Sequence, residues 1–306
     1  MKQIGHYLQL FLQSQRFVHF WATWTLMLGI CLVLRYGLEY QPGTGEGKMA
    51  FLEGILFFPV AYLGTLALYS LLTGRGQFWR APSFWMLSSL ILGALWWVQF
   101  GTFYEYWLPQ TETSGRKWYA RLAYNLHVSF FYGLVPLAYG LWQQQWQATR
   151  GYGLTASGFA WKPYGWMLAL MAPLLIVASY LPDFQLAYPR YKPGAWEYYQ
   201  GIWPASTIVG FELSYVWQFV MLELFFRGFM IMALRPFLGE AAVFPMVGVY
   251  VFLHFTKPLA ETLGSFFGGL VLGTTAFYSG SILGGILVHV GVALLMEALA
   301  YGQLWS

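Results

Sequence analysis

Two opposite charges lie four residues apart in one of the most apolar segments of the chain. The segment MLELFFRGFM, residues 221–230, contains Glu223 and Arg227. Residues at this spacing share one face of a helix and can form an ion pair. An ionisable residue in the middle of a membrane helix costs about 2.5–3.5 kcal/mol on insertion scales, so such residues usually face a bundle interior or a watery cavity. The pair therefore indicates either a functional site or a buried ion pair that joins two helices.

Two histidines, His254 and His289, lie in two further apolar segments. If the turns at 235–240 and 279–281 lie on the same side of a membrane, a rise of about 1.5 Å per residue places Glu223 roughly 18 Å, His254 roughly 21 Å and His289 roughly 14 Å from that side. Separate helices would then bring one carboxylate and two imidazoles to a similar depth. A lone buried histidine is usually structural, whereas this convergence is typical of a site.

One carboxylate and two imidazoles suit two kinds of chemistry. Glu223 could act as a general base that takes a proton from water, while His254 and His289 position that water or stabilise an oxyanion. This reaction needs no cofactor. Alternatively, Glu223, His254 and His289 could bind a divalent metal such as zinc and leave one position open for water. The spacing of the three residues leaves both alternatives open.

The elements that must position these residues are membrane-spanning helices. The chain has 306 residues, 58% of them hydrophobic and 9% charged, whereas soluble domains contain about 25% charged residues. Runs that approach the roughly 20 apolar residues needed to cross a bilayer predict an all-α, polytopic transmembrane bundle of eight or nine spans. The runs lie near 17–36, 50–72, 83–104, 119–142, 164–182, 205–233, 241–256, 260–278 and 281–301.

The candidate residues divide the chain into two regions. Residues 1–200 are predicted to form about five N-terminal spans with their loops, and residues 201–306 a core of about four spans that contains Glu223, Arg227, His254 and His289. Glycines at small-xxx-small spacing in the last two runs, such as Gly280 and Gly284, predict closely packed helices there. Lysines and arginines are almost evenly divided between the two sides of this topology, so the positive-inside rule favours an inner N-terminus only weakly.

The pattern around these polar residues resembles that of the CPBP family of intramembrane proteases, which includes the CAAX prenyl endopeptidases and the bacteriocin-processing (Abi) proteins. The family pattern is Glu-Glu-x-x-x-Arg, then Phe-x-x-x-His, then His-x-x-x-Asn or Asp, on successive helices. The corresponding residues here are Leu222, Glu223 and Arg227, then Tyr250 and His254, then His289 and Ala293. The resemblance covers about residues 205–301 and implies proteolysis within the membrane by a glutamate-activated water.

Three positions depart from the family pattern. Leu222 replaces the first glutamate, which is commonly assigned as the base, and Ala293 replaces an amide or acid that would help to hold an oxyanion. Tyr250 in place of phenylalanine is a mild change. Neighbouring helical residues point about 100° apart, so Glu223 cannot simply take over the direction of the missing glutamate. Glu297, two turns beyond His289, could supply a second carboxylate.

The sequence therefore predicts an intramembrane endopeptidase, of glutamic or metal-dependent type, with Glu223 as base or support for the base. Arg227 would orient Glu223, and His254 and His289 would act on water and oxyanion. The alternative is a catalytically inactive member that binds a peptide or partner as a scaffold or immunity protein. A transporter is disfavoured, because the chain lacks the inverted repeats typical of that class.

The expected surroundings follow from the same features. We expect a multi-pass integral membrane protein of a bacterial cytoplasmic membrane, whose partners are the lipid bilayer and a membrane-associated peptide or protein substrate. The net charge of +4 comes without a clustered basic stripe, which argues against nucleic-acid binding. Lys257 and Glu261, which flank Pro258 between two predicted spans, could line the entrance to the site.

Overall fold

The computed structural model describes residues 2–39, 47–101, 103–108, 113–157, 159–194, 197 and 200–304. All regular secondary structure within these residues is helical, which confirms the predicted all-α bundle. The helices before the predicted core are α1 (Lys2–Ser14), α2 (Val18–Leu32) with a π-helical turn (Val33–Gly37), α3 (Gly47–Thr73), α4 (Pro82–Phe100), α5 (Thr113–Trp142), α6 (Gln145–Ala148), α7 (Arg150–Gly153), α8 (Trp161–Ala178) and α9 (Pro182–Ala187), with 3-10 turns at Gln77–Arg80 and Phe103–Trp107.

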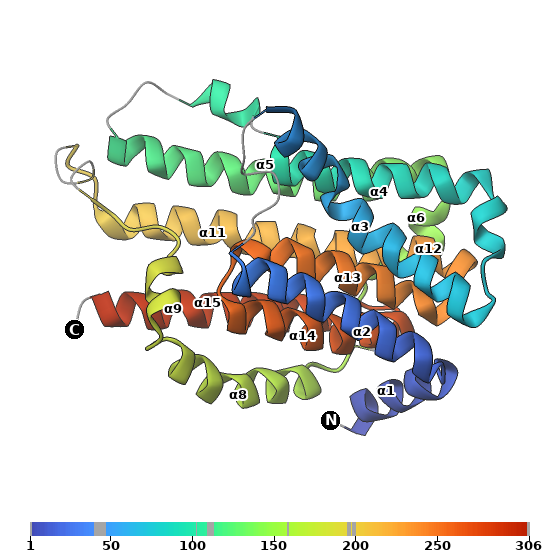
Figure 1. Ribbon diagram of the computed structural model, residues 1–306. Helices are drawn as coiled ribbons and strands as arrows, with labels where there is room; N and C mark the ends of the chain where they lie inside the picture. Colours follow the sequence, from blue (N-terminus) through green and yellow to red (C-terminus); the bar gives the residue numbers. More distant parts are fainter. Residues whose placement is uncertain are drawn as a thin grey trace.

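The predicted core is built from five further α-helices and the short segments that connect them. They are α11 (Pro204–Glu223), a π-helical segment (Leu224–Met230), α12 (Ile231–Leu238), a 3-10 turn (Gly239–Ala242), α13 (Val243–Leu253), a second 3-10 turn (His254–Thr256), α14 (Leu259–Ser279) and α15 (Leu283–Leu304). Helix α11 lies between α5 and α15, and α8 runs along α15 (Figure 1). The two predicted regions therefore pack against each other along their helices.

Helix α13 forms the centre of the bundle. Every residue from Val243 to Phe252 is buried, as expected for a helix that is apolar on all sides. It packs against α3 on one side and α14 on the other. At about 1.5 Å per residue its 11 residues rise only about 16 Å, roughly half of a hydrocarbon core about 30 Å thick. The turn that follows α13 therefore lies inside the bundle.

The outer helices present large apolar side chains to the surroundings. Leu71, Leu174, Val177 and Leu213 are each more than half exposed. Such a surface is unfavourable in water but matches the acyl chains of a bilayer. The chain is an integral membrane protein.

Each predicted span overlaps an α-helix of the structure, but the number of spans is not confirmed. Six helices are long and apolar enough to cross a membrane in the part of the chain described above. This number counts Pro204–Thr256, which contains two of the predicted spans, as one unit.

Candidate functional site

Glu223 and Arg227 form the predicted ion pair at the junction of α11 with its π-helical extension. Arg227 Nη1 lies 3.0 Å from Glu223 Oε1, and both side chains are buried, with exposures of 1% and 0%. All seven residues of the π-helical segment are buried as well. A π-helical segment inserted into a helix is rare and frequently marks a functional site.

His289 on α15 contacts the same carboxylate. Its Nδ1 lies 2.8 Å from Glu223 Oε1. The close approach of α15 depends on Gly285, because a Cβ atom at this position would lie 2.3 Å from Glu223 Oε2. The adjacent Gly284 presses against the ring of Tyr164 on α8. These two glycines let α15 fit between the carboxylate and α8. Gly284 belongs to the glycine spacing noted in the sequence, whereas a Cβ atom at its partner Gly280 meets no atom within 4 Å.

His254 follows α13 and begins the turn inside the bundle. Its Nδ1 lies 2.7 Å from the backbone carbonyl oxygen of Tyr250. Because a carbonyl only accepts hydrogen bonds, Nδ1 carries the hydrogen, and the neutral ring has its lone pair on Nε2. The turn is fixed through the His254 carbonyl, which accepts hydrogen bonds from Thr262 Oγ1 at 2.6 Å and Tyr36 Oη at 3.3 Å.

Tyr250 lies at the centre of these groups. The Arg227 guanidinium is 3.9 Å from the centre of its ring, and the His254 and His289 rings lie 4.5 and 6.1 Å from it. Its hydroxyl oxygen is 3.3 Å from His289 Nε2. The sequence interpretation treated Tyr250 as a mild replacement of phenylalanine and missed this role. The signal was the hydroxyl itself, a polar group added at a motif position.

A cavity of about 490 Å³ adjoins this group of residues. Its lining includes His254, His289, Tyr250, Arg227, Leu222 and Ala293, whereas Glu223 is not among the described residues that line it. The structure thus brings the four predicted site residues together but separates them into two layers. The histidines and Arg227 reach the cavity, and Glu223 lies behind them. The two departures at Leu222 and Ala293 both face the cavity.

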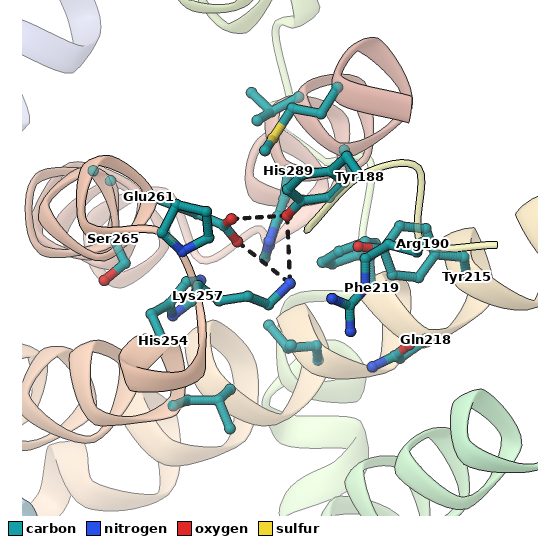
Figure 2. Close-up of a pocket in the computed structure, with 18 of the residues that line it drawn as sticks. Tyr188, Arg190, Tyr215, Gln218, Phe219, His254, Lys257, Glu261, Ser265 and His289 are labelled. Atoms are coloured by element: carbon teal, nitrogen blue, oxygen red, sulfur yellow. Dashed lines mark hydrogen bonds and ion pairs between the residues drawn. The ribbon is translucent and has the colours of Figure 1, made fainter. Parts of the chain in front are cut away.

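Lys257 and Glu261 line the same cavity, and their place at its entrance stays a prediction. Figure 2 shows them beside Tyr188, which belongs to the segment between α9 and α11. The Tyr188 hydroxyl donates to Glu261 Oε2 at 2.8 Å, and Lys257 Nζ lies 3.5 Å from Glu261 Oε1. Lys257 Nζ also donates to Tyr188 Oη at 3.4 Å. A small polar network therefore links α14 to this connecting segment at the cavity.

Glu297, the predicted second carboxylate, lies elsewhere. It is buried, and both of its carboxylate oxygens lie 3.1 Å from the backbone nitrogen of Arg190. It is not among the described residues that line the cavity. Its position indicates a structural role, since it holds the connecting segment against α15.

The residues named for a metal do not direct their donors to one point. Glu223 Oε1 and His289 Nδ1 face each other, and His254 Nδ1 faces a backbone carbonyl. Within the described residues, no group of three or more His, Cys, Asp or Glu side chains could hold a metal ion. The arrangement does not fit a shared ion, and the metal-dependent alternative stays a prediction.

A comparison with known protein families finds one family model that matches the region of the site. The fold and the buried polar site define an integral membrane protein with a cavity inside a helical bundle. Residues 195–295, about a third of the chain, match the family model described as Rce1-like, type II CAAX prenyl endopeptidase Rce1-like. The match agrees with the resemblance to the CPBP/CAAX protease family found in the sequence, and it covers nearly the same residues. No curated protein and no solved structure matches the chain.

Proposed function

We propose that the chain is an intramembrane endopeptidase that hydrolyses a peptide bond of a membrane-associated protein or peptide. The observation that carries this proposal is the cavity inside the bundle, which both motif histidines line. The buried ion pair of Glu223 and Arg227 lies directly behind them. The match to a protease family supports the same reaction. The apolar part of the lining suits a substrate segment that enters from the bilayer.

In the proposed reaction, His254 accepts the proton. Its Nε2 has the lone pair and His254 lines the cavity, so a water molecule there can transfer a proton to it. The oxygen of this water forms a bond to the peptide carbonyl carbon. The π electrons of the carbonyl group move to the carbonyl oxygen, which becomes the oxyanion. The C–N bond then breaks, and His254 returns the proton to the leaving nitrogen. The products are a carboxyl terminus and an amino terminus.

Glu223 supports this reaction through His289. The carboxylate accepts from His289 Nδ1 at 2.8 Å, and Arg227 holds the carboxylate from the other side. This contact fixes the ring orientation and the tautomer of His289, because a carboxylate that accepts from one ring nitrogen of a histidine sets the protonation of both nitrogens. The glutamate thus acts as the support for His289 and, through it, for the groups in the cavity.

A non-catalytic binding protein is the second candidate. The observation in its favour is Leu222, an apolar side chain that lines the cavity at the position of the family's first glutamate. In this alternative the cavity holds a peptide or partner without cleaving it, and the protein acts as a scaffold or immunity factor.

The host membrane in both proposals is a bacterial cytoplasmic membrane, which fractionation of the cells tests.

The test compares new peptide termini in membranes from cells that express the intact protein, His254→Ala, Glu223→Gln or no protein. We expect termini that appear with the intact protein, disappear with His254→Ala and become rarer with Glu223→Gln. His19→Ala is the matched control, because His19 is an exposed histidine on α2. The comparison also records any growth or membrane defect of cells without the protein that the intact protein corrects. If no termini differ and His254→Ala corrects this defect as well, the protein is a binding protein and not an enzyme.

A further inference from the structure

The three departures from the family pattern share one cavity. Leu222, Tyr250 and Ala293 all line it. The first and the last remove a polar group from the family pattern, whereas Tyr250 adds one. A site without the amide or acid at position 293 has one polar group fewer than the family pattern, and a tyrosine hydroxyl is a suitable donor to an oxyanion.

We propose that the Tyr250 hydroxyl donates the hydrogen bond that stabilises the oxyanion, in place of the group missing at Ala293. This inference rests on the proposed endopeptidase function and assigns a catalytic residue to it. The proton balance of the reaction does not change, because Tyr250 keeps its proton and only shares it with the oxyanion. His254 remains the group that takes and returns the proton of water.

The contacts of Tyr250 support this role. Its hydroxyl oxygen lies 3.3 Å from His289 Nε2, which is long for a hydrogen bond from a hydroxyl group. The hydroxyl is therefore held loosely by His289, and its hydrogen can rotate toward the cavity. His289 is in turn fixed by Glu223 at 2.8 Å. The contacts from Glu223 to His289 and from His289 to Tyr250 hold the hydroxyl in place and leave its hydrogen available for a second acceptor.

A cation and an anion both lie near this hydroxyl: the Arg227 guanidinium favours a developing negative charge, and the Glu223 carboxylate paired with it opposes one. The Arg227 guanidinium lies 3.9 Å from the centre of the Tyr250 ring, and both residues line the cavity. Tyr250 is only 4% exposed, so bulk water screens the interaction weakly. Preorganised donors in such a site stabilise developing charge more strongly than the same groups do in water.

The alternative role for Tyr250 is packing. Its ring contacts Phe226 at 5.4 Å and His254 at 4.5 Å, and these contacts need only the ring. Tyr250→Phe separates the two roles, because it keeps the ring, removes the hydroxyl and restores the family residue. Tyr62→Phe is the matched control. Tyr62 is fully buried and its hydroxyl lies 3.1 Å from Ser88 Oγ, but it is not among the described residues that line the cavity.

The experiment measures kcat and KM of the purified full-length proteins in vesicles on a synthetic peptide. The peptide spans the bond identified by the new termini described above. We expect Tyr250→Phe to lower kcat about 10²–10³-fold, the usual effect of removing one oxyanion donor, with KM unchanged. Tyr62→Phe should leave both constants within about twofold, because its effect is limited to one hydrogen bond outside the cavity.

Three results would overturn the inference, and one of them would also overturn the proposed reaction. If Tyr250→Phe keeps the kcat of the intact protein while His254→Ala abolishes cleavage, the hydroxyl is a packing group and the endopeptidase stands. If His254→Ala cleaves the peptide as fast as the intact protein, the proposed reaction fails together with this inference. A drop in the thermal unfolding midpoint for Tyr250→Phe beyond that for Tyr62→Phe, with kcat unchanged, also assigns Tyr250 to packing.

Discussion

Two ion pairs with the same four-residue spacing have different surroundings in this molecule. Arg227 and Glu223 are 1% and 0% exposed, at 3.0 Å, whereas Lys257 and Glu261 are 21% and 20% exposed, at 3.5 Å. The first pair lies behind the cavity in the core of the bundle, and the second lines the cavity beside Tyr188 (Figure 2). The spacing in the sequence predicted the first pair, whereas Lys257 and Glu261 were predicted only to line an entrance.

The difference between the pairs shows that burial decides how strongly a charge depends on its partner. A buried charge that loses its partner cannot be solvated, so breaking such a pair costs about 3–5 kcal/mol. A partly exposed pair contributes about 0–1 kcal/mol, because water and salt screen it. The buried pair should therefore contribute more to the stability of the bundle than the partly exposed pair does.

The largest effect is expected from Arg227→Met, which breaks the buried pair. The change leaves the Glu223 carboxylate buried without its cation and should lower the free energy of unfolding by about 3–5 kcal/mol. Unfolding in detergent, followed by circular dichroism, measures this loss. The double variant Glu223→Leu/Arg227→Met should lose less than the single variant, because no unpaired charge remains. Equal losses would mean that the pairing of the charges contributes little.

A smaller effect is expected from Gly285→Ala, which leaves the charges in place but disturbs their packing. The new Cβ atom would lie 2.3 Å from Glu223 Oε2, so the carboxylate or α15 must move, at about 1–3 kcal/mol. Peptide cleavage should fall as well, because His289 is on the same helix. Gly302→Ala is the control on α15, since a Cβ atom at Gly302 meets no atom within 4 Å. Equal unfolding midpoints for the two variants would show that the close approach is unimportant.

The turn between the two pairs should respond to Thr262→Val. This change removes the hydroxyl that donates to the His254 carbonyl at 2.6 Å, and one such hydrogen bond contributes about 0.5–1.5 kcal/mol. Because the turn positions His254, we expect the loss in kcat, expressed as activation free energy, to exceed the loss in the free energy of unfolding. Thr275→Val removes a comparable hydrogen bond on α14, at 2.7 Å to Val271, and should leave kcat unchanged. A similar kcat for both variants would argue against positioning by Thr262.

The smallest effect is expected from Lys257→Met. The partly exposed pair should contribute no more than about 1 kcal/mol, and high salt should reduce the difference further. Measuring the unfolding midpoint of both proteins at low and high salt tests this expectation. A loss as large as that of Arg227→Met would remove the distinction between the two pairs.

The fold and part of the site could be predicted from the sequence. Apolar runs identified the helices because a segment that crosses a bilayer must satisfy its own backbone hydrogen bonds. The four-residue spacing identified the pair of Glu223 and Arg227, and helix length brought His254 and His289 to their neighbourhood. The small residues of the last helices indicated the close approach that Gly284 and Gly285 provide.

The layering of the site could not be predicted, because it depends on which way each side chain points. Glu223 ends α11 where the helix changes to a π-helical segment, and such a change alters the register that an ideal helix would give. The hydroxyls of Tyr36 and Thr262 both donate to the His254 carbonyl, and Tyr36 lies more than two hundred positions before His254 in the chain. A lone tyrosine in the N-terminal region gives no sequence signal for this contact.

The most direct test of the central claim uses the purified protein in vesicles, the identified peptide and water enriched in oxygen-18. The account predicts that the intact protein places one oxygen-18 atom in the new carboxyl terminus, because the water oxygen forms the bond to the carbonyl carbon. His254→Ala should give no labelled product, and His19→Ala should give as much as the intact protein. Cleavage of the peptide without label in the new carboxyl terminus, or the same labelled yield from His254→Ala, would contradict the account.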